Sequence, residues 1–126
     1  PGCPELRRRT AEYIMDQMGR KAVLDACQRI YPTFQSRDIP YPEIKFRKMK
    51  SQWGNCRPDK GRLTFNTRLS SVSEYCIELV VAHEFTHFLH RDHSDNFYSS
   101  LSGIIPDHKE RKRQLRAFEK ELAMTR

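Results

Sequence analysis

The stretch that decides the fold is Val80–His93 (VVAHEFTHFLHRDH). Its apolar residues predict a buried helix, and on a helix His83 and His87, four positions apart, share one face with Cβ atoms about 5–6 Å apart. Such a pair suits two imidazoles that bind one zinc ion at roughly 2.0–2.1 Å. Glu84, about 100° around the helix from His83, can reach a water beside the ion without binding the ion itself. The spacing therefore predicts two zinc ligands and a catalytic base on one helix.

Two later histidines compete for the place of the third zinc ligand. His90 shares the helix face, but seven helical residues place it ~10 Å along the axis from His83, which is too far for one tetrahedral ion. If the helix ends near His90, the next two residues can turn the chain and bring His93 back to the ion. We therefore expect His93 as the third ligand, with Glu110 as the fallback. Three protein ligands and one open position are typical of catalytic zinc.

Length and composition indicate one folded domain, 1–126, with a helical N-terminal part (1–42) and a metal-binding core (43–126). No apolar run approaches the ~18 residues of a membrane span, so we expect no membrane association. The chain begins with PGCP, without Met or a signal-peptide pattern, which is consistent with a trimmed chain. Its four cysteines form no Cys-x-x-Cys pair and are expected to be free thiols in a reducing cytoplasm. The oligomeric state is not indicated.

The net charge of +7 indicates a basic surface. Positive side chains gather at 7–9, 45–50 and 109–116. Such a surface attracts polyanions, which makes nucleic acid a candidate partner. However, these segments contain no recognisable nucleic-acid-binding motif, and 16 acidic residues are interspersed among the basic ones. A solvated basic surface is therefore the simpler interpretation.

The N-terminal part is predicted to be helical. Apolar periodicity favours helices at 5–18 and 20–30, with Gly19 separating them and Pro32 closing the second. A connector to residue 42 follows. These helices are expected to pack against the core and to carry no chemistry.

The middle of the chain predicts a hairpin. Residues 43–50 and 62–67 alternate apolar and polar side chains, which is typical of two strands of an antiparallel hairpin. The intervening 50–56 is too irregular for a plain strand; Trp53 is expected to pack, and Gly54 to permit a bulge or a close backbone approach.

Helices are expected beyond the hairpin as well. Ser71 or Ser73 can cap the metal-binding helix, and Ser94 can cap a short helix that ends near Gly103. A last helix is expected at 107–123, with its Lys and Arg side chains mostly in solvent. Together with the hairpin these elements predict a small α+β domain built around the metal-binding helix.

Four segments resemble the YgjP-like zinc metallopeptidase domain, a family related to the WLM and SprT-like metalloproteases. They are KSQWGNC (50–56), GRLTFN (61–66), HEFTH (83–87) and HSDNF (93–97), in the order of the family's pattern. The resemblance covers roughly residue 43 to the C-terminus. It implies a zincin-like fold, with the hairpin beside the metal helix, zinc held by His83, His87 and His93, and Glu84 as the catalytic acid/base.

The sequence thus predicts a zinc-dependent metallopeptidase that hydrolyses amide bonds in peptides or proteins. Glu84 would take a proton from the attacking water and later give it to the leaving amine. Further contacts to the substrate or transition state are expected from among Tyr98, His90, Arg91 and Asn66, and strand 62–67 is expected to hold an extended peptide by strand addition.

Two alternatives stay open. One is a SprT-like protease that the basic surface recruits to DNA, which would bind DNA in a salt-dependent manner. The other is a non-catalytic interaction domain whose zinc only stabilises the fold. An intact Glu84 beside the two ligands argues against the second.

Overall fold

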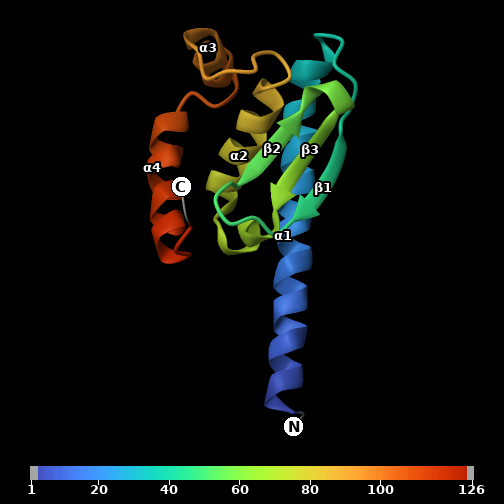
Figure 1. The fold of residues 1–126 in the computed structure, drawn as a ribbon, viewed down its shortest axis with the longest axis vertical. Helices are drawn as coiled ribbons and strands as arrows, with labels where there is room; N and C mark the ends of the chain where they lie inside the picture. Colours follow the sequence, from blue (N-terminus) through green and yellow to red (C-terminus); the bar gives the residue numbers. More distant parts are fainter. Residues whose placement is uncertain (1–2, 125–126) are drawn as a thin grey trace.

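The computed structural model describes residues 3–124, which form four α-helices and one three-stranded sheet. The predicted α+β class is confirmed. The expectation of a trimmed chain concerns residues that lie outside 3–124. No helix within 3–124 is long and apolar enough to cross a membrane. The helices are α1 (Pro4–Gln35), α2 (Glu74–Thr86), α3 (Asp95–Ile104) and α4 (His108–Glu121), and the strands are β1 (Glu43–Arg47), β2 (Gly54–Arg57) and β3 (Arg62–Asn66) (Figure 1).

The N-terminal part is one long helix, so the prediction of two helices separated at Gly19 is wrong. Gly19 lies inside α1, where a Cβ atom would come within 2.7 Å of the Cα of Ser70 in the short 3₁₀ helix η2 (Thr67–Ser71). The glycine therefore allows two backbones to approach. Pro32 also lies inside α1, close to its end at Gln35, where the missing N–H costs the helix a single hydrogen bond.

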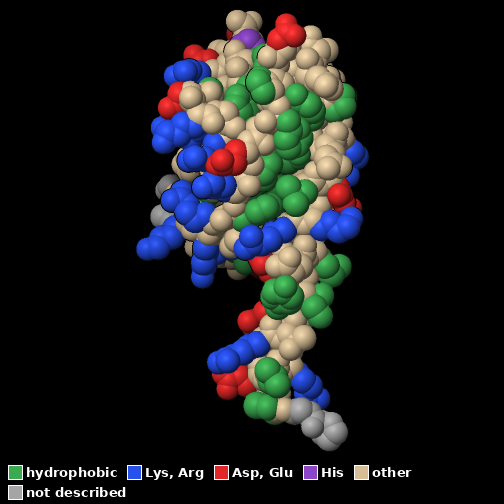
Figure 2. Space-filling view, turned by 90° about the vertical axis from the view of Figure 1, so that its right-hand side faces the viewer, with side chains coloured by type: hydrophobic (Ala, Val, Ile, Leu, Met, Phe, Trp, Pro, Cys, Tyr) green, Lys and Arg blue, Asp and Glu red, His purple; other side chains and the backbone are tan. Residues whose placement is uncertain are grey.

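The two halves of α1 have different surroundings. The second half buries Val23, Cys27, Ile30 and Phe34 in the core. The first half projects from the body of the molecule as a stalk, with hydrophobic side chains in solvent (Figures 1 and 2). Only the second half of α1 therefore supports the rest of the fold.

The sheet has the order β1-β3-β2, with β3 in the middle. β3 pairs with β1 in parallel and with β2 antiparallel, so the predicted antiparallel pairing of 43–50 with 62–67 is wrong. The hairpin consists of β2 and β3, joined through the short 3₁₀ helix η1 (Pro58–Lys60) and Gly61, whose φ of 60° lies in the left-handed region. β2 was missed because its side chains do not alternate between buried and exposed.

The crossover between β1 and β2 is held by Asn66, a fully buried side chain at the end of β3. The Asn66 side-chain amide donates hydrogen bonds to the carbonyl oxygens of Met49 (3.0 Å) and Gln52 (2.7 Å). Its Oδ1 accepts from the Met49 N–H at 3.2 Å. These bonds hold the segment between β1 and β2 at the end of β3, so that β2 pairs with β3 on the side opposite β1.

The central element is α2, which contacts α1, α3, α4 and β2. Ser73 rather than Ser71 caps it, accepting a hydrogen bond from the backbone N–H of Cys76. Most of its circumference is buried, including Val81 and Phe85, as the apolar sequence predicts. The regular helix ends at Thr86, one turn earlier than expected.

Candidate active site

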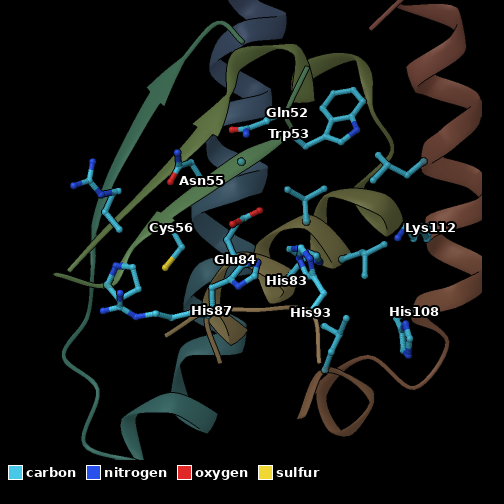
Figure 3. Close-up of a pocket in the computed structure, with 18 of the residues that line it drawn as sticks. Gln52, Trp53, Asn55, Cys56, His83, Glu84, His87, His93, His108 and Lys112 are labelled. Atoms are coloured by element: carbon cyan, nitrogen blue, oxygen red, sulfur yellow. The ribbon is translucent and has the colours of Figure 1, made fainter. Parts of the chain in front are cut away.

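Three histidine side chains converge next to the C-terminal end of α2. His83 lies in the last turn of α2, His87 follows the helix directly, and His93 comes from the segment beyond it (Figure 3). One ring nitrogen from each lies within 4.8 Å of those of the other two, and the Nε2 atoms of His83 and His93 are 3.1 Å apart. Nitrogens that bind one tetrahedral zinc ion at 2.0–2.1 Å are roughly 3.3 Å apart. The cluster therefore fits one such ion.

His90 supports the cluster and does not belong to it. Its carbonyl oxygen is 3.0 Å from Nδ1 of His87. A carbonyl can only accept, so Nδ1 of His87 carries the hydrogen and the lone pair of Nε2 is left for a metal ion. The His90 ring pairs with Ser100 instead, with Nε2 3.1 Å from the hydroxyl oxygen.

The surroundings of His83 and His87 disfavour their protonation. Burial lowers the pKa of His83 to about 3, and its electrostatic interactions with His87, His93 and Lys112 act in the same direction. Burial also lowers the pKa of His87. Because neutral imidazole is the form that binds a metal ion, the lowered pKa values of these two rings favour the metal-binding form.

Glu84 lies buried beside the histidines, with 8% of its surface exposed. Burial raises the pKa of its carboxyl group to about 8. The backbone of β2 packs directly on it: a Cβ atom on Gly54 would be 2.8 Å from Cγ of Glu84 and 3.2 Å from Oε2. The expected close backbone approach at Gly54 is thus confirmed, and it is the Glu84 side chain that β2 approaches.

A cavity of about 890 Å³ opens over the histidines and Glu84. One wall is β2 with the residues before it, and the opposite wall is α4 (Figure 3). The first wall includes Trp53, Gly54, Asn55 and Cys56; the second presents His108, Lys112 and Leu115. Tyr98 of α3 and Arg91 also line the cavity.

A buried hydrogen bond joins these two walls. The indole N–H of Trp53 donates to Oε1 of Glu119 in α4 at 2.9 Å, and both side chains are buried. The expectation that Trp53 packs in the core is confirmed. Since Trp53 directly precedes β2, this bond fixes the position of β2 relative to α4.

The remaining predicted site residues are divided between the cavity and other parts of the fold. Asn66 is buried outside the cavity and binds the 49–52 crossover. Glu110, the fallback ligand, is exposed on α4, where it pairs with Arg113 and takes no part in the histidine cluster. Arg91 and Tyr98 do reach the cavity.

The part that α4 plays in the cavity was not predicted from the sequence. The Lys and Arg side chains of this helix were expected mostly in solvent, and Lys112 is an exception that is half-buried in the cavity wall. The available signal was its spacing. His108, Lys112 and Leu115 recur at helical intervals of four and three residues, which puts all three on one face.

Comparisons with known proteins agree with this arrangement. Comparison of the sequence with curated proteins gives no match. Among solved structures, the fold is similar to the crystal structure of the metallopeptidase zymogen of Pyrococcus abyssi abylysin, with a TM-score of 0.65 at 17% sequence identity. The similarity covers 82% of this chain and 97% of that one, and at such low identity it speaks for the fold alone. Residues 3–118 match the model of the YgjP-like metallopeptidase domain. The chain therefore belongs to the YgjP-like metallopeptidase domain family.

Proposed function

We propose that the protein is a zinc-dependent peptidase in which His83, His87 and His93 hold the metal and Glu84 is the general acid/base. The observation that carries this proposal is the convergence of three imidazoles beside a buried carboxyl group, at a cavity, in a metallopeptidase-family chain. When bound, zinc supplies Lewis acidity, which lowers the pKa of water toward 7 and polarises a carbonyl group.

Glu84 would carry the proton between the two halves of the reaction. Its carboxylate accepts the proton of the attacking water, and the resulting carboxylic acid delivers that proton to the leaving amine. A carboxyl group whose pKa is raised by burial suits both steps near neutral pH. The close packing of Gly54 on Glu84 holds the carboxyl group in position during both steps.

One of the two edges of the sheet lies at the cavity and is available to an extended peptide. β3 is paired on both sides, which excludes it as the docking strand expected from the sequence. β2 is the strand that lines the cavity, and it lies at an edge of the three-stranded sheet. A substrate added alongside β2 would satisfy the unpaired backbone groups of that edge and pass over the histidine cluster. Tyr98 and Arg91 are the predicted contact residues placed to reach such a peptide.

The test is a Glu84→Gln variant, which keeps the shape of the side chain and removes the proton acceptor. Zinc-loaded wild-type and variant proteins are incubated with a mixed peptide library in isotopically labelled water, and products are read by mass spectrometry. We expect wild-type products to carry one solvent oxygen. Cleavage by the variant should fall by about 10²–10⁴-fold while zinc content stays the same.

The matched control is Glu12→Gln, which makes the same chemical change on the exposed stalk of α1. It should leave cleavage unchanged. Equal cleavage by wild-type and Glu84→Gln proteins would contradict the assignment of Glu84 and trace the activity to another site.

A further inference from the structure

Lys112 differs from the basic residues on either side of it. Arg111 and Arg113 both form ion pairs with carboxylates. Lys112 is half-buried in the cavity wall, and no carboxylate within residues 3–124 pairs with it. A partly buried ammonium group has lost some of its water, so it gains more from a carboxylate than an exposed lysine does.

The position of Lys112 places this charge within reach of a bound substrate. In Figure 3 Lys112 and His108 lie on α4, on the opposite side of His83 and His93 from Asn55 and Cys56 of β2. A peptide that runs along β2 over the histidines would therefore direct side chains or its end toward α4. The same cavity is lined by apolar side chains, which suit the methylene groups of such a substrate: Leu79, Val80, Leu101 and Leu115.

Two other ionisable groups of the cavity lining, His108 and Asp59, have partners of their own, which leaves Lys112 available to bind a substrate carboxylate. His108 stacks on Tyr98, and its Nε2 lies 3.0 Å from the hydroxyl oxygen of Ser102. Burial lowers the pKa of His108, which favours its neutral form and leaves Lys112 as the ammonium side chain that α4 presents to the cavity. Asp59, a carboxylate of the cavity lining, is already paired with Arg57.

We propose that Lys112 forms a carboxylate-binding subsite for the substrate on the α4 side of the cavity. The inference rests on the proposed peptidase function and narrows its substrate class. The preferred peptide presents a carboxylate near the cleaved bond, either as an acidic side chain or as its own C-terminus. A charge-assisted hydrogen bond from the ammonium group supplies the selectivity.

Four peptides distinguish the two sources of the carboxylate. They share the sequence of a cleaved library peptide, carry Glu or Gln beside the cleaved bond, and end in a free carboxylate or an amide. In one of the two pairs, Glu/Gln or free carboxylate/amide, we expect kcat/KM to be about tenfold higher for the peptide that carries the carboxylate, as for a typical charge-assisted contact. A difference within the Glu/Gln pair identifies a side chain, and one within the carboxylate/amide pair identifies the C-terminus.

Lys112→Met should bring this ratio close to one. Lys120→Met removes the same charge from an exposed position on the same helix and should keep the wild-type ratio. A ratio that survives in Lys112→Met would overturn the proposal. So would a Lys112→Met protein that loses activity on all four peptides by the same factor, because Lys112 would then act on the reaction and not on selectivity.

Binding provides a readout without turnover. Trp53 is the single tryptophan of the chain and lines the same cavity, so its fluorescence reports on the four peptides added to zinc-loaded Glu84→Gln protein. Tighter binding of the carboxylate peptides, lost in a Glu84→Gln/Lys112→Met protein, supports the subsite even if the wild type cleaves nothing and the peptidase function fails. If the wild type cleaves the peptides but neither kcat/KM nor Trp53 fluorescence shows a preference for the carboxylate peptides, the subsite is overturned and the peptidase function stands.

Discussion

The two sides of the cavity are assembled in different ways. The histidine side takes its ionisable side chains from one helix and the segment after it, within residues 83–93. The facing side joins the residues around β2 to a helix more than fifty positions later, through the hydrogen bond between Trp53 and Glu119. The comparison shows that side chains brought together by local helix geometry can be found from their spacing in the sequence. A wall made by two distant segments has to be seen in the structure.

The largest expected effect concerns the histidine side. His93→Ala should weaken zinc binding by more than the roughly 10–100-fold that is typical for a supporting residue. His90→Ala is the matched control, because it keeps the backbone carbonyl that orients His87 and removes only the ring that pairs with Ser100. Competition with a chromophoric chelator measures both. Stronger zinc loss in His90→Ala than in His93→Ala would reverse the two roles.

The next effect is the pH dependence of the metal-free protein. The pKa of Glu84 is raised from 4.5 to about 8, so between these values the folded chain holds a proton that the unfolded chain has lost. Raising the pH through this window therefore lowers the free energy of unfolding of the wild type but not of Glu84→Gln. The free energy of unfolding of Glu84→Gln should exceed that of the wild type by an amount that grows by up to about 1.4 kcal/mol per pH unit and vanishes below pH 4.5.

Urea unfolding in chelator at pH 5, 6, 7 and 8 measures this difference. The lowered pKa of His83 has the opposite sign, since it costs stability as the pH falls below 6.5, but both proteins share it and it cancels. A difference between the two proteins that is the same at all four pH values would show that Glu84 does not hold its proton in the folded state.

A smaller effect is expected where the two sides touch. Gly54→Ala would place a methyl group against Cγ of Glu84 and should lower the free energy of unfolding by about 1–3 kcal/mol, as overpacking does. It should also reduce cleavage by moving the carboxyl group. Gly103→Ala in α3 is the control: its Cβ would meet nothing within 4 Å, so it should stabilise the helix by roughly 0.5–1 kcal/mol. Equal stability changes in the two variants would contradict the close contact.

The smallest effect should come from the link between the walls. Glu119→Gln keeps the shape of the side chain but weakens its bond with the Trp53 indole from charge-assisted to neutral, at a cost of about 1 kcal/mol. The exposed Glu121→Gln in the same helix should stay within ±0.5 kcal/mol, roughly the range of surface changes. Thermal unfolding followed by Trp53 fluorescence separates the two. A Glu119→Gln protein as stable as the control would show that the bond does not hold the walls together.

The features that could be predicted from the sequence are those set by local structure, and the features that could not be predicted depend on contacts between distant segments. Ser73 and Ser94 cap helices as local preferences indicate, and His93 lies with His83 and His87 because a short segment returns to the helix end. Gly19 was misread because its packing partner, Ser70, is fifty-one positions away. A nucleic-acid partner and the cellular compartment stay predictions.

The sheet was misread for a related reason. The parallel pairing of β1 with β3 depends on a crossover that Asn66 pins through backbone hydrogen bonds, and no periodic pattern records such a contact. Lys112 was not singled out because a strongly basic helix is expected to be solvent-exposed until the elements that pack beside it are known.

The central claim is that three histidines bind zinc and leave one position for water and substrate. X-ray absorption at the zinc edge of the loaded protein measures the ligand set directly. We predict a shell of nitrogen and oxygen atoms at about 2.0–2.1 Å with the scattering of three imidazoles. Cys56 lines the cavity, and burial raises the pKa of its thiol to about 12, so no sulfur is expected. A sulfur scatterer near 2.3 Å, or a shell with fewer than three imidazoles, would contradict the account.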